Sequence, residues 1–131
     1  MLKNEEHIQN FIEEAKIHVE TLENRLVNIN LDAVDPEEVH AIFRAVHSMK
    51  GSAGFFNLNK IVELSHCMES LFGEIRNGKI IIEEEMVDIL LVANDCLKAM
   101  IDDVANSENM DIADHVQNIS RYLRAEKTPP T

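Results

Sequence analysis

A histidine, a lysine and two glycines are the residues of this sequence best suited to chemistry. His47 is followed by Lys50, Gly51 and Gly54 in a stretch that otherwise has a helical pattern. Glycine inside a helix costs about 1 kcal/mol relative to alanine, so its presence here indicates clearance for a large partner that approaches His47. A neutral imidazole is a nucleophile, and the Lys50 ammonium could counter a phosphoryl charge. These residue types at this spacing could accept and donate a phosphoryl group at His47.

A second set of polar residues, His66 and Glu69, lies on the following predicted helix. If the two helices form an antiparallel hairpin that turns near Asn57, His47 lies level with Glu69, because helical side chains lean toward their own N-terminus. By the same count, Lys50 lies level with His66. A carboxylate that accepts a hydrogen bond from Nδ1 of a neutral imidazole fixes the tautomer and leaves Nε2 free. We therefore expect Glu69 to orient His47.

Five amphipathic segments are available to position these residues. Apolar residues recur at spacings of three and four in segments at about 4–28, 36–54, 60–76, 83–106 and 111–125. Asp35 before Pro36 is typical of a helix start, Gly78 is typical of a helix end, and either Asn57 or Asn59 could cap the third segment. The short connections favour an all-α fold, an antiparallel four-helix bundle with an additional C-terminal fifth helix.

The apolar face of the second segment sets the place of His47. We expect this face to bury Val39, Ile42, Phe43, Val46, Met49 and Ala53. On a helical wheel His47 lies on the flank of that face, where a partner can reach it. Residues 1–125 are expected to form one phosphoacceptor domain, and residues 126–131, which contain two prolines, are expected to begin a linker to further domains.

Composition excludes several classes of partner. The formal net charge of −12 argues against nucleic acid and against anionic membrane surfaces, which both attract clustered Lys and Arg. No apolar run is long enough to span a bilayer, and the first residues lack the apolar core of a secretory signal. Cys67 and Cys96 are too few for a disulfide framework. We therefore expect a cytoplasmic domain without nucleic-acid or membrane partners.

A metal site is the main rival interpretation of the polar residues. Two Glu-x-x-His pairs occur, Glu37 with His40 and Glu63 with His66, and di-iron helical bundles use that spacing. On the helical wheel both pairs face away from the predicted core, so we expect no metal site. The sequence also lacks a glycine-rich phosphate loop, so the phosphoryl donor must be bound by another domain.

Four stretches together resemble a known family. They are His47-Ser-Met-Lys-Gly-Ser-Ala-Gly54, Phe11-Ile-Glu-Glu-Ala, Ala41-Ile-Phe-Arg-Ala and Ser65-His-Cys-Met-Glu-Ser-Leu71. The chain resembles the histidine phosphotransfer (HPt) domain and, more narrowly, the N-terminal phosphoacceptor domain of chemotaxis histidine kinases of the CheA type. The similarity covers most of the chain.

The resemblance implies a relay in a two-component system. His47 would be phosphorylated on Nε2 by an ATP-binding kinase domain of the parent protein. It would then pass the group to an aspartate of a response regulator, such as a CheY- or CheB-like receiver. ATP and Mg²⁺ would be held by those partner domains, with no cofactor here. Glu69 would bind the phosphoacceptor, and Lys50 and His66 would complete its polar network.

The resemblance also implies a docking surface around the histidine. Gly51 would clear space for the incoming domain, and Arg44, Ser48 and Gly54 would border it. The roles of His40 and Gly73 stay open. The parent would be a histidine protein kinase, whereas the domain alone lacks kinase motifs and is expected to be a monomer. Two alternatives stay open as well, an HPt module of a non-chemotaxis phosphorelay and a helical docking domain without phosphotransfer.

Overall fold

The computed structural model describes the backbone of residues 2–127 and the side chains of residues 5–124. Its elements in chain order are α1 (Leu2–Val27), α2 (Pro36–Phe55), α3 (Asn59–Arg76), α4 (Glu84–Asp102), the short 3₁₀ helix η1 (Val104–Asn109) and α5 (Ala113–Lys127). No β-strand occurs within residues 2–127. The all-α prediction is confirmed.

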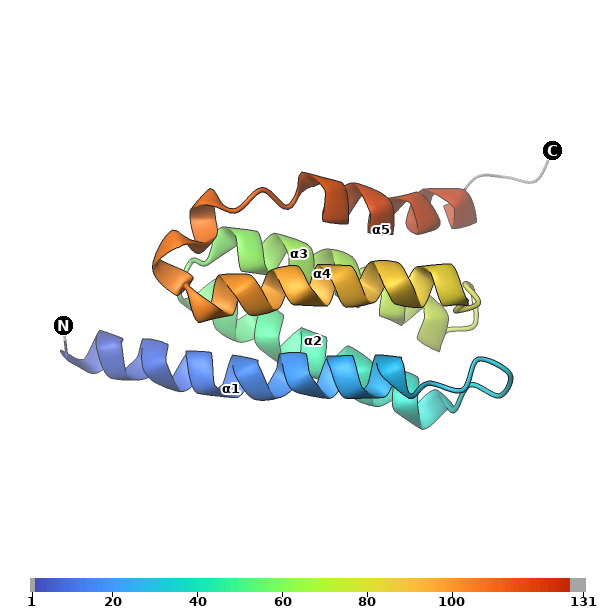
Figure 1. Ribbon diagram of the computed structural model, residues 1–131, viewed down its shortest axis with the longest axis horizontal. Helices are drawn as coiled ribbons and strands as arrows, with labels where there is room; N and C mark the ends of the chain where they lie inside the picture. The colour runs from blue at the N-terminus through green and yellow to red at the C-terminus, as the bar shows by residue number, and fades with distance from the viewer. Residues whose placement is uncertain (1, 128–131) are drawn as a thin grey trace.

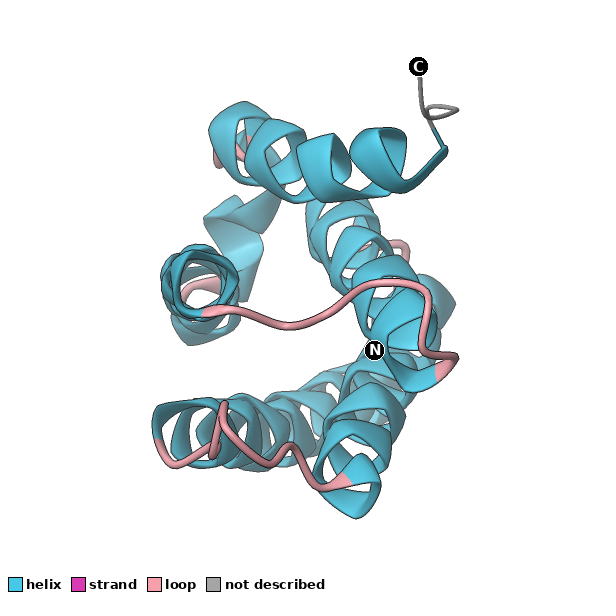
Figure 2. Cartoon of the chain, turned by 90° about the vertical axis from the view of Figure 1, so that its right-hand side faces the viewer, coloured by secondary structure: helices cyan, strands magenta, loops and turns pink. Residues whose placement is uncertain are grey.

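Helices α1 to α4 form an antiparallel bundle, and α5 lies outside it (Figure 1). Within the described residues, each of the four packs against two neighbours in the ring order α1–α2–α3–α4, and the backbones of diagonally opposite helices do not approach each other closely. Helix α5 packs on α3 and α4, and the end view in Figure 2 shows it flanking that side of the bundle. This arrangement confirms the predicted four-helix bundle with a fifth helix.

The interior of the bundle is mostly aliphatic. Helix α1 buries its predicted face with Phe11, Ala15, Val19, Leu22 and Leu26, and all other helices of the bundle contribute a similar stripe. A buried polar contact joins α4 to α1, because Nδ2 of Asn94 donates to the Val19 carbonyl oxygen at 2.9 Å. Apolar burial of this extent is what holds the helices in place.

The second helix differs from its prediction at one core position. Phe43 is only partly buried, and Ala45 is buried on α2 instead. The Phe43 ring lies instead at the flank between α2 and α3, where it stacks beside His47 and contacts the Arg76 guanidinium. The other five predicted core residues of this helix are buried.

The turn between α2 and α3 closes the hairpin that we expected. Asn57 has φ of 58°, a left-handed conformation that asparagine tolerates better than most residues. The amide of Leu58 donates to the Ala53 carbonyl at 3.0 Å, and the amide of Asn57 donates to the Gly54 carbonyl at 3.1 Å. These two bonds make a Schellman motif, which reverses the chain without a glycine at the turn.

The start of α3 is capped from a distant part of the chain. Leu58 occupies the N-cap position without a side-chain cap, so the expectation that Asn57 or Asn59 would cap this helix is wrong. Glu108 of η1 replaces it, since its Oε1 accepts from the Lys60 amide and its Oε2 accepts from Nδ2 of Asn59, both at 3.0 Å. A carboxylate at this position also complements the positive end of the helix dipole.

The fourth and fifth helices end at different residues from those predicted. Helix α4 stops at Asp102, before the predicted end at residue 106, and the chain continues as η1. Asn106 donates to Oδ2 of Asp103, and Ser107 donates to the Val104 carbonyl, which is how short polar side chains compete with a continuing helix. Helix α5 continues to Lys127, so the first two residues of the predicted linker are helical, and residues 128–131 lie outside the described residues.

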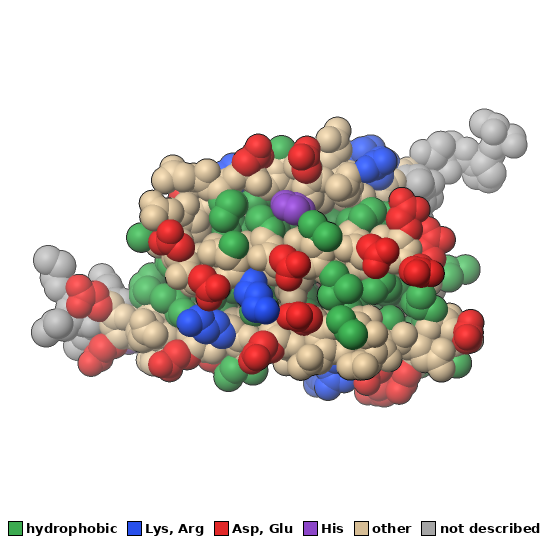
Figure 3. All heavy atoms as spheres, in the orientation of Figure 1, with side chains coloured by type: hydrophobic (Ala, Val, Ile, Leu, Met, Phe, Trp, Pro, Cys, Tyr) green, Lys and Arg blue, Asp and Glu red, His purple; other side chains and the backbone are tan. Residues whose placement is uncertain are grey.

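The molecular surface is acidic over the face that carries α1, α4 and α5. Asp and Glu side chains are spread across all of the face shown in Figure 3.

Within residues 2–127 there is no helix with the length and apolar character needed to cross a lipid bilayer.

Candidate functional site

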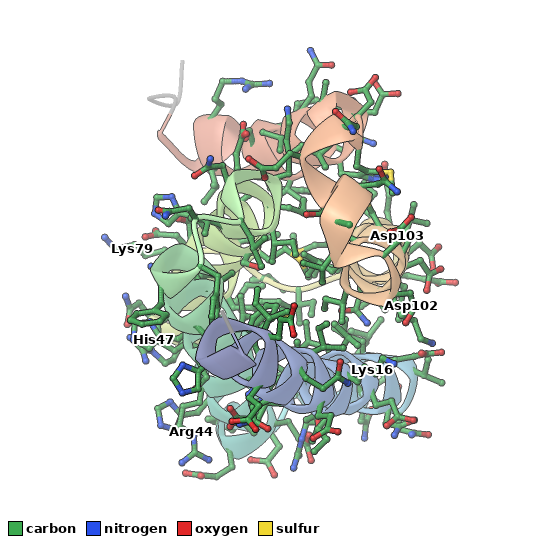
Figure 4. The ribbon with its side chains drawn as sticks, turned by 90° about the vertical axis from the view of Figure 1, so that its left-hand side faces the viewer. Lys16, Arg44, His47, Lys79, Asp102 and Asp103 are labelled. Carbon is green, nitrogen blue, oxygen red and sulfur yellow. The ribbon has the colours of Figure 1, made fainter. Side chains whose placement is uncertain are left out.

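His47 lies on the outer flank of α2, with its ring directed away from the bundle. Its side chain is 64% exposed, as the helical wheel predicted for a reactive residue. In Figure 4 His47 and Arg44 lie on one side of the molecule, whereas Lys16, Asp102 and Asp103 lie on the opposite side. The helix therefore presents the imidazole to a partner while its other face is buried in the core.

Glu69 of α3 binds two of the basic side chains of α2, His47 and Lys50. Its Oε2 is in hydrogen-bond contact with Nδ1 of His47, and its Oε1 accepts a 2.6 Å hydrogen bond from Nζ of Lys50. The Glu69 side chain is only 12% exposed. Both carboxylate oxygens are therefore engaged, and the predicted pairing of Glu69 with His47 is what the structure contains.

The protonation state of Glu69 follows from three competing effects. Burial alone would raise the pKa of its carboxyl group, but the hydrogen bonds and positive charges of Lys50 and His47 together lower the pKa below its ordinary value of 4.5. Glu69 is consequently ionised at neutral pH. An ionised carboxylate can only accept hydrogen bonds, so the contact with Nδ1 requires a proton on that nitrogen.

The tautomer of His47 leaves Nε2 as the reactive atom. With the proton on Nδ1, a neutral imidazole carries its free electron pair on Nε2. This is the orienting role that a carboxylate has toward histidine at metal and hydrolase sites. The arrangement can therefore perform a nucleophilic attack from an exposed nitrogen of a ring whose tautomer is set by Glu69.

An open hollow of about 500 Å³ lies beside this pair, at the flank between α2 and α3. It is bordered by His47, Lys50, Glu69, Phe43, Gly73, Glu74, Arg76 and Leu123, together with Ser70 of α3 and Asn77, which directly follows α3. Its basic residues come from both helices. A phosphoryl group on His47 would lie at its edge, next to positive charge.

The structure does not bring His66 into this cluster. His66 is exposed and makes no hydrogen bond or ion pair within the part of the chain that the structure describes. Lys50, which we expected to lie level with His66, extends instead to Glu69. A functional role for His66 therefore stays a prediction.

The four predicted docking residues all lie on the surface. Arg44, Ser48, Gly51 and Gly54 are exposed. A Cβ atom added at Gly51 would have no atom within 4 Å, and one added at Gly54 would come within 4.0 Å of Cγ2 of Val62. Space inside this domain therefore does not demand a glycine at position 51, and its role in docking stays a prediction.

The sequence analysis did not place Phe43 or Arg76 at this site. Phe43 stacks beside the imidazole, with ring centroids 6.2 Å apart and planes within 7°, and Cζ of Arg76 lies 4.1 Å from the centroid of the Phe43 ring. The available signal was spacing, because Phe43 precedes His47 by four residues and shares its face of the helix. We had assigned Phe43 to the core because it is apolar.

Metal-ligating residues do not gather anywhere in the described chain. Within residues 2–127, no three His, Cys, Asp or Glu side chains are arranged to hold a metal ion. Among the polar residues of the candidate site, His47 and Lys50 both bind Glu69.

Comparisons with known proteins assign the chain to a family. The sequence profile of the Hpt domain matches residues 6–107. The chemotaxis protein CheA of Treponema pallidum (strain Nichols) is 34% identical over 129 residues, which are 97% of this chain and 16% of that protein. CheA of Salmonella typhimurium is 33% identical over 120 residues, 90% of this chain and 18% of that protein.

A third relative also matches most of this chain. The sensor histidine kinase CheAY of Helicobacter pylori is 30% identical and covers 92% of this chain, and the chain covers 15% of that protein. The chain thus spans less than a fifth of the length of these three relatives.

One similar solved structure is the phosphorylated P1 domain of CheA3 in complex with CheY6 from R. sphaeroides, with a TM-score of 0.75 and 24% identity over 89% of this chain and 98% of that one. This likeness shows a shared fold. Because the family profile covers most of the sequence, the chain belongs to the Hpt domain family, which confirms the resemblance found from its motifs.

Proposed function

We propose that this domain is the phosphorelay module of a two-component chemotaxis system. His47 accepts a phosphoryl group from an ATP-binding histidine kinase domain and passes it to an aspartate of a response regulator. The observation that carries the proposal is the contact of Glu69 with Nδ1, which leaves Nε2 as the free nucleophile on a side chain that is 64% exposed.

The first transfer forms the bond between nitrogen and phosphorus. The electron pair on Nε2 attacks the γ-phosphorus of ATP held by the kinase domain, the bond from that phosphorus to the bridging oxygen breaks, and ADP leaves with the electron pair. The proton on Nδ1 stays in place, hydrogen-bonded to Glu69. The negative charge of Glu69 stabilises the positive charge that develops on the ring.

The second transfer reverses the role of the imidazole. An aspartate oxygen of the response regulator attacks the phosphorus, the Nε2–P bond breaks, and its electron pair returns to Nε2. Lys50 lies one turn from His47 and holds the other oxygen of Glu69, so it keeps the carboxylate in position and contributes positive charge beside the phosphoryl group.

The relatives support a particular setting for this chemistry. The curated relatives are chemotaxis proteins CheA and a sensor histidine kinase, and the similar solved domain is phosphorylated and bound to CheY6. We infer a cytoplasmic parent that is a histidine protein kinase, with a CheY- or CheB-like receiver as the second partner. ATP and Mg²⁺ belong to those partner domains, and the isolated domain is a monomer.

Replacement of His47 tests this function directly. With the parent kinase domain and ATP, His47→Gln is expected to abolish acid-labile phosphate on the domain and to leave its helical circular dichroism unchanged. His18→Gln, which alters a histidine of α1 away from the site, serves as the matched control and is expected to be labelled like the wild type. Undiminished acid-labile phosphate in His47→Gln would exclude the proposal.

The same assay tests the docking alternative, and the domain composition of the parent protein tests the non-chemotaxis alternative. A helical docking domain without phosphotransfer would bind its partners and show no phosphohistidine. A non-chemotaxis phosphorelay would show phosphohistidine, but its parent would lack the dimerisation, ATP-binding and coupling domains of a CheA kinase. The domain composition of the parent polypeptide therefore distinguishes the two relay readings.

A further inference from the structure

The ring of His47 has an aromatic neighbour as well as a carboxylate partner. The Phe43 ring lies parallel to the imidazole, with the planes within 7° and the centroids 6.2 Å apart, inside the range for offset-stacked aromatic pairs. Both rings project from the same face of α2 because they are four residues apart. The stacking therefore joins two side chains of one helix at its outer flank.

Two residues of α3 hold the Phe43 ring in this position. Gly73 has no side chain, and a Cβ atom built there would be in van der Waals contact with Cε2 of Phe43 at 3.5 Å, so the ring lies over the place where a side chain at this position would begin. Arg76, one turn further along α3, places Cζ 4.1 Å from the centroid of the ring, which is a cation–π contact. Phe43 is thus held by both helices of the hairpin.

One hydrogen bond does not fix the plane of an imidazole. The χ2 torsion of histidine is broad, and the Glu69 contact restrains only Nδ1, so the ring can still tilt about the line from Cβ to Nδ1. A tilt of that kind moves Nε2, the atom that must lie in line with the bond that breaks. A parallel ring beside the imidazole restricts the tilt.

We propose that Phe43, seated by Gly73 and Arg76, is a positioning residue that sets the plane of the His47 imidazole and so aims Nε2. This inference rests on the phosphotransfer proposed above. It assigns Gly73 a place in the site, because a bulky side chain on that turn of α3 would displace the Phe43 ring. Phe43 acts through the His47 ring, since its own side chain has no charge or hydrogen-bond donor to offer a phosphoryl group.

Substitution of Phe43 tests the inference with two independent readouts. Phe43→Leu is expected to lower kcat for phosphorylation by the ATP-bound parent kinase domain about tenfold, with KM little changed, because misaligned reacting atoms slow the chemical step. In the unphosphorylated domain, ¹³C relaxation of the His47 ring should show a lower order parameter on the ps–ns timescale. Phe43→Tyr keeps the ring and is expected to restore both values.

Phe55→Leu is the matched control. It removes an aromatic ring from the same helix, but Phe55 is 77% exposed and its ring contact is with Phe56. We expect it to leave the His47 order parameter and kcat at their wild-type values. Arg76→Met should shift the order parameter in the same direction as Phe43→Leu and by a smaller amount.

Two results would overturn the inference, and a third would overturn the proposed function alone. Unchanged ring order in Phe43→Leu, with or without slower phosphorylation, would show that Phe43 does not position the imidazole. A raised KM with normal kcat would make it a docking residue. If the wild-type domain is not phosphorylated at all, the proposed function fails, whereas the relaxation experiment still reports whether Phe43 orders the ring.

Discussion

Two lysine–glutamate pairs cross between helices of this bundle, and they differ in almost everything except composition. Lys50 and Glu69 join α2 to α3 at 2.6 Å, with side chains 26% and 12% exposed. Lys98 and Glu23 join α4 to α1 at 3.1 Å, with side chains 44% and 40% exposed. The first pair has a third hydrogen-bonded member, because His47 contacts the other oxygen of Glu69.

The difference shows where a charge pair can carry function. An exposed pair is solvated and screened, and it contributes little to stability. The Glu69 carboxylate is largely removed from water, so it needs both of its partners, and it constrains them in return. The pair between α1 and α4 lies on the exposed surface and, among the described residues, orients no third group. The pair between α2 and α3 includes the carboxylate that sets the tautomer of an exposed nucleophile.

The largest expected effect comes from removing the carboxylate that binds the imidazole. Glu69→Ala is expected to slow phosphorylation of His47 by about 10- to 100-fold, the range typical for loss of a carboxylate that orients a histidine ligand, while the helical circular dichroism is retained. The measurement is the initial rate of phosphohistidine formation with the parent kinase domain. Glu23→Ala, the equivalent change in the exposed pair, should react like the wild type. Wild-type kinetics in Glu69→Ala would remove Glu69 from the mechanism.

The lysines should differ in their effect on stability. Lys50→Met leaves the buried Glu69 without one of its two partners, so we expect the free energy of unfolding to fall by about 1–2 kcal/mol. Lys98→Met removes a partner of an exposed carboxylate and should leave the denaturant midpoint unchanged. Urea titrations of both variants at neutral pH make the comparison, and equal losses would show that burial does not distinguish the pairs.

The pKa shifts of Glu69 and Lys98 should contribute to stability over opposite ranges of pH. The pKa of Glu69 is below its ordinary value of 4.5 in the folded protein, so its contribution to stability is complete above that pH and is lost as the pH falls through the folded value. The hydrogen bond and charge of Glu23, with Asp95 and Glu20 adding, raise the pKa of Lys98 above 10.5, so that contribution is lost as the pH rises. The difference in unfolding free energy between wild type and Glu69→Gln should therefore shrink as the pH is lowered. A difference that stays constant on acidification would show that folding does not lower the pKa of Glu69.

The smallest expected effect tests whether the surface beside the functional pair is kept open. Gly51→Ala should stabilise α2 by about 0.5–1 kcal/mol, because a Cβ atom there meets nothing within 4 Å. It should slow transfer from the kinase domain and leave phosphorylation by phosphoramidate, a small donor, unchanged. Equal slowing with both donors would show that Gly51 acts on His47 itself and not on docking.

The sequence was sufficient for the hairpin that creates the site. Helical periodicity and the lean of side chains predicted the meeting of His47 with Glu69, because both are local rules. The pairs His47 with Glu69 and Phe43 with Gly73 are each equidistant from Leu58, one residue beyond the turn that we had used.

What escaped prediction depends on side-chain choices that the backbone pattern does not determine. Lys50 is long and flexible, so it reaches Glu69 and not the level of His66. Phe43 is apolar, and periodicity alone could not tell a core ring from one stacked on a flank. The cap of α3 comes from Glu108, and a contact over so long a separation leaves no local signal.

The long-range cap of α3 determines where this domain can be cut from a longer protein. The family profile ends at residue 107, one residue before the carboxylate that receives the Lys60 amide. A fragment trimmed to the profile would hold every residue of the phosphoacceptor site, yet it would lose that cap together with Ile112 and Ile119, which are buried against the bundle. Transplanting the relay into another protein therefore calls for a boundary beyond α5, since the helix that carries Glu69 is anchored by residues outside the part of the chain that the family profile matches.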